Sequence, residues 1–322
     1  MTFKERYIEF CQVESQIPIF SQPWWLDIVC GSENWEVILV EKGGQIVASF
    51  PYYMYTGTLG MHHITLPVLT QKLGPYIKYP KGQKPVSKLS YEKEILEEII
   101  DKLPEYDSFN ISFDYKYTNW LPFYWRGFQQ STRYTYVVND ISDAQTVFNN
   151  FHGNKRTDIR KAEKYVEVRY DLSGEEFLEY YVNSLKKQGK TLAYSVTVLL
   201  NLCQAAYDHN HGRIIYAIDD KGNIHSAILY VWDAKAIYSL VTAFDPEFRT
   251  FASSSLLFYQ IMKDFSFSGL VFDFEGSMIE NIESSYNKFG AIQTPYFRIY
   301  KLNSRKCRFV QAVKDLIHAI RN

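Results

Sequence analysis

The sequence is poor in the features that mark secreted, zinc-binding or membrane-spanning proteins. It has four Cys, scattered at positions 11, 30, 203 and 307 without a C-x-x-C pair, which argues against a zinc site and a disulfide framework. No apolar run approaches the ~18 residues that a membrane span needs. The N-terminal segment also lacks the apolar core of a signal peptide. We therefore expect reduced thiols, no metal, no membrane span and a cytoplasmic location.

The chain also has almost no net charge and lacks the hydrolase motif G-x-S-x-G. The 35 Lys and Arg residues nearly balance the 36 Asp and Glu residues, so the net charge is −1 and any contact with RNA needs a local basic patch. No G-x-S-x-G motif occurs, which excludes a nucleophile elbow. Asp208, His209 and His211 cluster at an expected helix end, where capping is the ordinary role and a metal site is the alternative.

Aromatic residues are abundant. They make up 17% of the chain, with 26 Tyr and 22 Phe, and they either line a stacking surface for sugars or bases or fill the interior. We favour the second explanation, because Ala and Leu are few. A hydrophobic content of 46% with 22% charged residues describes a globular protein with a full core. A length of 322 residues suits two domains.

An internal duplication supports two domains. Three pairs of segments recur in the same order: 35–55 with 213–232, 109–114 with 270–275, and 127–138 with 290–301. The first pair reads as two hairpins, the second as two buried strands, and the third begins with Gly in both copies. A repeat of this length indicates two copies of one domain, which we place at 1–140 and 141–322.

The second copy can be divided into expected elements. After a polar helical segment broken at Gly153, these are a strand at 165–172, helices at 173–189 and 195–210, the hairpin, a strand at 236–244, a helix to about 265, a strand at 270–276, a helix at 279–289 and two strands within 292–302. Ser173 and Glu176 have capping-box spacing. The first copy keeps a helix at 90–103 and a shortened helix near 23–31.

The C-terminal segment 308–320 has the spacing of an amphipathic helix. Its apolar face consists of Phe309, Val310, Val313, Leu316, Ile317 and Ile320. The simplest interpretation is a helix that docks on its own domain through this face. A membrane or dimer contact is the alternative.

The element order resembles the GNAT N-acyltransferase superfamily. The GNAT diphosphate turn has its counterpart in Pro246, Arg249, Ala252 and Ser254, and Tyr286 precedes Gly290 by four residues, as in the family. The basic "KRTDIRKAEK" (155–164), the strand "FDFEGS" (272–277) and the tandem copies look like the Fem-type peptidyltransferases and their acetyltransferase-like relatives. The resemblance is strong over 150–302 and weak over 20–138.

The resemblance implies an α/β fold with an α+β mixed sheet, in two tandem GNAT-like acyl-CoA N-acyltransferase domains. Domain 1–140 is degenerate, because its "TQKLGPYIKYP" (70–80) has lost the turn signature. Domain 141–322 carries the donor-binding turn and the C-terminal helix. Ala252 and Ser254 fill both Gly positions of that turn, and a Cβ there narrows the approach of a phosphate to the main chain.

The resemblance also assigns roles to residues of the second copy. Main-chain amides near the end of strand 236–244 would polarise the acyl carbonyl. The donor diphosphate would be held by Arg249, Phe251, Ala252, Ser253, Ser254 and Ser255. Asp273 and Glu275, on one face of a strand, would supply the base, and Tyr286 would protonate the thiolate. The structural alternatives are an N-cap for the serines, caps or salt bridges for the carboxylates, and the core for Tyr286.

Arg156 and Arg160 share a predicted helix face with Lys164 and would grip a phosphate of a nucleotide-linked acceptor or of tRNA; a solvated face is the alternative. The sequence therefore predicts an N-acyltransferase that acts by direct transfer. Its donor would be acyl-CoA such as acetyl-CoA, rather than aminoacyl-tRNA, and its acceptor an amine on a cell-envelope or sugar precursor. A non-catalytic GNAT-fold binding module is the second hypothesis. The oligomeric state stays open.

Overall fold

The computed structural model describes residues 1–276 and 278–321, and the chain forms two compact units. Unit 1 consists of Met1–Arg133 together with the described residues from Pro295 on, and unit 2 of Tyr134–Thr294. The last strand and helix thus group with the first unit, whereas the sequence placed them in a domain 141–322. The physical reason is the pairing of that last strand, described below.

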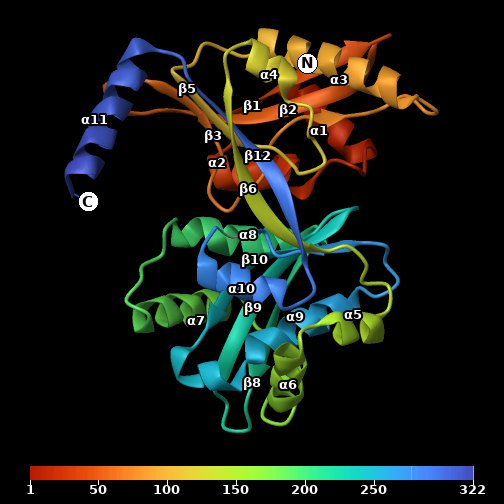
Figure 1. The fold of residues 1–322 in the computed structure, drawn as a ribbon, viewed down its shortest axis with the longest axis vertical. Helices are drawn as coiled ribbons and strands as arrows, with labels where there is room; N and C mark the ends of the chain where they lie inside the picture. Colours follow the sequence, from red (N-terminus) through yellow and green to blue (C-terminus); the bar gives the residue numbers. More distant parts are fainter. Residues whose placement is uncertain (277, 322) are drawn as a thin grey trace. The chain divides into compact units, whose positions relative to one another are not determined.

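Unit 1 is a mixed sheet covered by helices (Figure 1). Its elements are α1 (Phe3–Val13), α2 (Pro23–Cys30), β1 (Trp35–Lys42), β2 (Gln45–Thr56), β3 (His62–Thr65), β4 (Tyr76–Ile77), α3 (Pro85–Asp101), β5 (Ser108–Ser112), α4 (Leu121–Trp125) and α11 (Arg305–Arg321). The strand order is β1-β2-β3-β5, followed by the second half of β12 (Ile292–Leu302). Only the β3–β5 pair of this set is parallel.

Unit 2 repeats that plan at greater length. After the second half of β6 (Gln129–Val138), its elements are α5 (Ala144–Asn150), α6 (Gly153–Ala162), β7 (Glu167–Arg169), α7 (Gly174–Lys187), α8 (Val196–Asp208), β8 (Gly212–Ile218), β9 (Ile224–Trp232), β10 (Ala236–Phe244), the 3-10 helix η3 (Pro246–Phe251), α9 (Ser253–Asp264), β11 (Val271–Asp273) and α10 (Glu280–Asn287). The strand order is β6-β11-β10-β9-β8-β7. Figure 1 shows α7 and α8 on one side of these strands and α5, α6 and α9 on the other.

The duplication predicted from the sequence is visible in the topology. The series β1-β2-β3-α3-β5-α4-β6 has the same order as β8-β9-β10-α9-β11-α10-β12. In both series the first three strands form antiparallel neighbours and the third strand pairs in parallel with the fourth. The two copies therefore share one fold, as the tandem prediction required.

The last strand of each copy pairs with the penultimate strand of the other copy. In unit 2, Val137 and Val138 of β6 pair with β11. In unit 1, residues 298–302 of β12 pair with 108–112 of β5. This exchange places the C-terminal segment in unit 1. The sequence also predicted two strands within 292–302, but the structure has a single strand of 11 residues there.

Aromatic side chains fill both interiors, which agrees with the explanation favoured above for their abundance. Trp25, Trp35 and Phe109 are among the largest fully buried side chains of unit 1, and Tyr136 and Tyr230 of unit 2. Aromatic rings also join the elements of the candidate site. The ring centroid of Phe258 in α9 lies 6.1 Å from that of Phe272, 5.1 Å from that of Phe274 and 5.5 Å from that of Phe289. A shared aromatic core therefore fixes α9 against β11 and α10.

The helix α11 does not use its apolar face to dock, so that expectation is wrong. Phe309, Leu316 and Ile320 are 71%, 62% and 75% exposed. The side of α11 that meets unit 1 instead carries Cys307, which is buried, and Val310. The sequence spacing identified the helix and five of the six residues of its exposed apolar face, but Val310 lies on the side that meets unit 1, and the spacing did not show the direction in which the face points.

Candidate active site

The strands β10 and β11 separate in the middle of unit 2. They pair in parallel only from Ala236 to Tyr238, and β11 ends at Asp273 while β10 continues to Phe244. On its other edge β10 stays paired with β9, and a bulge interrupts that register between Ser239 and Val241. A bulge re-aims the main chain next to it. The edge of β10 after Tyr238 is thus the place in this unit where an extended ligand can hydrogen-bond to main-chain groups.

A tight turn connects β10 to α9. The Asp245 side chain accepts from the N–H of Glu247 and caps η3, and Ala252 then adopts the left-handed region with φ 56° and ψ 29°. Ala252 is the N-cap of α9, so neither Ser253 nor Ser254 has the capping role that was the structural alternative. The start of α9 lies beside the cavity described below. The N-terminus of a helix favours an anion.

The serines of this turn make tertiary contacts. The Ser255 hydroxyl accepts from Lys155 Nζ at 3.0 Å, and Ser253 Oγ lies 3.3 Å from His225 Nδ1. Two of the five amides assigned to the diphosphate already donate within the turn. Ala252 N–H donates to Arg249 O at 3.2 Å, and Ser255 N–H donates to Ala252 O at 2.9 Å. The donor cradle therefore needs side chains in addition to main-chain amides.

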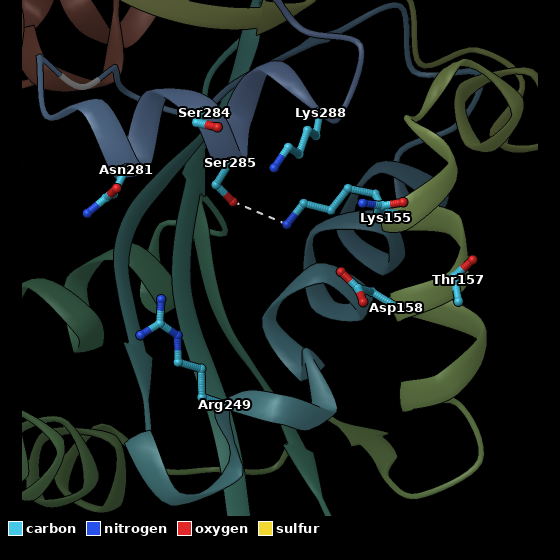
Figure 2. Close-up of a pocket in the computed structure, with 9 residues that line it drawn as sticks. Lys155, Thr157, Asp158, Arg249, Asn281, Ser284, Ser285 and Lys288 are labelled. Carbon is cyan, nitrogen blue, oxygen red and sulfur yellow. Dashed lines mark hydrogen bonds between the residues drawn. The ribbon is translucent and has the colours of Figure 1, made fainter.

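A polar cavity of about 570 Å³ opens beside the start of α9. Its lining comes from α6, η3 and α10: Asn154, Lys155, Thr157, Asp158, Arg249, Asn281, Ser284, Ser285 and Lys288. Figure 2 shows Lys155, Lys288 and Arg249 directed toward one space from three different segments. Three cations against one carboxylate make this cavity suitable for an anion with several oxygen atoms, such as a phosphate.

Lys155 connects the walls of the cavity. Besides Ser255, its Nζ donates to Ser285 Oγ of α10 at 3.1 Å, and it lies 4.6 Å from the centroid of the Phe289 ring. Burial lowers the pKa of Lys155, Lys288 lowers it further, and Asp158 opposes both effects. A desolvated cation close to a second cation binds an anion strongly, because the anion relieves both penalties.

The structure brings the three predicted catalytic residues together. Tyr286 is held in the core by stacking on Phe274, with ring centroids 4.4 Å apart. Burial raises its pKa to about 12, and the nearby carboxylates of Glu275 and Asp273 raise it as well. Tyr286 therefore keeps its proton at neutral pH. It has the packing expected of a core residue and the electrostatics expected of a proton donor.

The two carboxylates differ in environment. Asp273 is fully buried and accepts hydrogen bonds from the Thr135 hydroxyl and from the N–H of Glu275, the latter at 2.8 Å. Glu275 follows the end of β11, is half-buried and has φ 60°, a left-handed conformation that non-Gly residues rarely adopt. Asp273 thus holds the backbone of Glu275 in an unusual conformation. Ser277, the last residue of the "FDFEGS" motif, lies outside the described residues.

The two arginines predicted to bind the acceptor are engaged elsewhere. Arg156 Nη1 donates to the carbonyl oxygens of Asn149 at 2.6 Å and Phe151 at 2.9 Å, which closes the C-terminal end of α5. The guanidinium of Arg160 lies 5.2 Å from the centroid of the Phe148 ring. Neither residue lines the cavity.

Sequence reasoning missed Lys155 and Lys288. Lys155 belongs to the same basic run as Arg156, and only the rotation of α6 decides which of two neighbouring side chains enters the cavity. Ser284 and Lys288 have i, i+4 spacing on α10, which was the available signal for a shared polar face.

A buried histidine also escaped the sequence analysis. His225 of β9 stacks on Phe248, with centroids 4.1 Å apart, and its Nε2 lies 3.2 Å from Asp219 Oδ2. Asn223 holds the pKa of Asp219 well below its usual range, and His225 contributes to the same shift. Through Ser253, this chain of contacts attaches the β8–β9 turn to the start of α9.

Two further findings concern metals and membranes. Among the residues that the structure describes, no three His, Cys, Asp or Glu side chains gather closely enough to hold a metal ion. None of the helices in the described chain combines the length and apolar character needed to cross a membrane.

Comparison with known families agrees with this geometry. Residues 149–280 match the family model of an acetyltransferase (GNAT) domain. That segment contains the strand opening, the turn, Lys155 and Arg249. The part of the site on α6, β10, η3 and β11 therefore lies in the segment that matches a GNAT domain, and the part on α10 follows directly after it. No protein of curated function matches the sequence.

Solved structures extend the likeness to nearly the whole chain. The crystal structure of FemX aligns with a TM-score of 0.67 at 13% identity, over 92% of this chain and 96% of that one. A conserved protein of unknown function from Bacteroides thetaiotaomicron gives 0.55 at 10% identity, over 94% and 98%. A domain assigned to a lysylphosphatidylglycerol synthetase from Agrobacterium fabrum gives 0.55 at 12% identity, over 96% of both chains. The chain thus contains a segment that matches a GNAT domain, and as a whole it has the tandem fold of these structures.

Proposed function

We propose that this protein is an N-acyltransferase that takes an acyl group from acyl-CoA, such as acetyl-CoA, and moves it directly to an amine. The observation that carries the proposal is the cationic cavity at the start of α9, next to the point where β10 and β11 separate. Lys155, Arg249 and Lys288 would bind the phosphates of the donor, with first-turn amides of α9 assisting.

The reaction uses groups on both sides of the strand opening. Main-chain amides of β10 beyond the bulge would stabilise the oxyanion that forms on the acyl carbonyl. Glu275 would accept the proton of the attacking amine, and Asp273 would position it through the bond to its N–H. Tyr286, which stays protonated, would give its proton to the departing thiolate. No bond between the acyl group and the enzyme is needed.

Acyl-CoA is the better donor for this site than aminoacyl-tRNA. A tRNA needs exposed cations along its backbone, but Arg156 is bound to two carbonyl groups and Arg160 lies over Phe148. We place the reaction in the cytoplasm, and the acceptor class is a small-molecule or nucleotide-linked amine on a cell-envelope or sugar precursor. The structural neighbour that is named as a domain of a lysylphosphatidylglycerol synthetase supports an acceptor of the envelope.

Isothermal titration with acetyl-CoA and with longer acyl-CoAs tests the donor. We expect saturable binding that Arg249→Glu and Lys288→Glu weaken by at least about tenfold each, because each reverses a charge that contacts phosphate. Lys164→Glu is the matched control: it reverses an exposed charge of the same basic run outside the cavity. Absence of binding to every acyl-CoA and to charged tRNA would remove the enzyme hypothesis and leave the binding module.

A further inference from the structure

The helix α11 has its polarity reversed relative to an ordinary surface helix. Five apolar side chains lie on one helical face and are exposed, and we call them the outer face: Phe309, Val313, Leu316, Ile317 and Ile320. An apolar stripe on a surface helix normally faces the core. A contiguous exposed stripe of this kind indicates that something else covers it.

The opposite face of α11 is the one that meets unit 1. Cys307, Val310, Gln311 and Lys314 line a cavity of about 770 Å³ together with residues of β3, β5 and β12. Figure 1 shows α11 extending from the end of β12 with no helix of unit 1 packed along it. Because the face with Cys307 and Val310 is turned toward its own unit, the outer face points away from that unit.

The charge of α11 also departs from that of the chain. Between Arg305 and Ile320 the helix carries Arg305, Lys306, Arg308 and Lys314 against one acidic residue, Asp315, so its net charge is +3. Since the whole chain has a net charge of −1, the remainder has −4. Arg305 and Lys306 precede Phe309 by four and three residues, which places them at the first turn of the outer face.

We propose that the outer face of α11 binds an anionic lipid surface, with the helix lying in the plane of the interface. A helix with aromatic and aliphatic residues on one face and an excess of Lys and Arg is suited to this role, since apolar burial and attraction to anionic headgroups add. A second copy of the chain with its helix parallel to this one is the less suitable partner, because two clusters of Arg305 and Lys306 would then lie together. The absence of a spanning helix among the described residues fits a helix that lies on the membrane.

Co-sedimentation of the full chain with vesicles tests the proposal. We expect binding to vesicles of equal parts phosphatidylcholine and phosphatidylglycerol, and little binding to vesicles of phosphatidylcholine alone. The variant Phe309→Glu/Leu316→Glu/Ile320→Glu should lose binding at least about a hundredfold, because it removes the apolar contacts. The variant Arg305→Glu/Lys306→Glu should lose about fivefold per cation at low salt.

Two controls keep the result interpretable. Tyr207→Glu changes a side chain of α8 that is similarly exposed, at 69%, and should leave vesicle binding unchanged. Circular dichroism should show equal helical content and equal melting temperature for every variant, because no outer-face residue is buried. Equal binding to both vesicle types, or a triple variant that still binds, would overturn the proposal. So would a dimer in sedimentation velocity that the triple variant converts to a monomer without any vesicle binding.

Discussion

Lys155 is the side chain on which the proposed donor site depends most. Its lowered pKa gives the site a pH dependence, because only the protonated amine attracts phosphate. Donor affinity should be highest below that lowered pKa and should fall as the pH rises through it, before ordinary lysines titrate. Titration calorimetry across the alkaline range should show this decline in the native protein. Lys155→Met should bind about tenfold more weakly at neutral pH and lose the alkaline decline.

Tyr286 gives a second test at a single atom. Tyr286→Phe removes only the hydroxyl and keeps the stacking on Phe274, so the melting temperature should stay the same. The rate constant kcat should fall about a hundredfold, because the thiolate would leave without a proton donor. The pKa of Tyr286 is about 12. Raising the pH from neutral toward, but not up to, this pKa should therefore cause no loss of kcat through ionisation of Tyr286. A rise in KM with kcat unchanged would assign Tyr286 to binding.

Asp273 and Glu275 should separate into a positioning residue and a catalytic one. Asp273→Ala leaves the Thr135 hydroxyl and the Glu275 N–H without this buried acceptor, and should lower the free energy of unfolding by about 3 kcal/mol. Glu275→Gln should keep the stability and lose most of kcat. Denaturant unfolding beside steady-state rates measures both. If Glu275→Gln retains full activity, the base must be sought elsewhere.

The resemblance to GNAT enzymes pointed to Asp273, Glu275 and Tyr286, but nothing in the sequence predicted the cavity. Asp273 and Glu275 were expected on one face of a strand, because side chains alternate along a strand. The strand β11 ends at Asp273, however, and Glu275 lies beyond it in a left-handed conformation, joined to Asp273 by the hydrogen bond from its N–H. The choice between Lys155 and Arg156 depends on how α6 rotates against α9, which tertiary packing decides. Arg156 was expected to bind a phosphate, because a guanidinium group can donate two hydrogen bonds to one. Its guanidinium instead donates to the main-chain carbonyl oxygens of Asn149 and Phe151.

Among the elements, the turn before α9 departs furthest from its family pattern. Ala252 stands in the left-handed region, where a Cβ is unfavourable and Gly is not. Ala252→Gly should therefore raise the free energy of unfolding by up to about 1 kcal/mol, because relief of this strain exceeds the entropy cost of Gly. Ala252→Val should lower it. Thermal melts of the three proteins rank them directly.

Helices and strands with strong periodicity were predictable from the sequence. The helix α11 was predictable too, but the orientation of its apolar face was not. The strand 236–244 and the capping box at Ser173 were predicted as the structure has them. For α11 the spacing defined an apolar face, but a face carries no information about its partner. The orientation follows from the contacts of Cys307 and Val310 with unit 1.

For the whole chain, the exchange of last strands determines which fragments fold. Residues 134–294 make up the whole of unit 2, including the part of β6 that pairs with β11, so this fragment should melt cooperatively by itself. Residues 1–140 lack the strand 298–302 that pairs with β5 and should fail to do so. Far-ultraviolet circular dichroism on both fragments checks this. The domain boundary near 140 that the sequence indicated would be supported instead if 1–140 and 141–322 each melted cooperatively.

The reciprocal exchange of β6 and β12 has an evolutionary consequence. In a simple tandem repeat, a copy without a ligand-binding turn can accumulate mutations or be deleted, because the other copy folds without it. Here deletion of the first copy would remove the strand that pairs with β11 and expose a sheet edge beside the proposed catalytic residues. Selection for the proposed activity of the second copy would therefore also preserve the first copy, because the first copy supplies this strand.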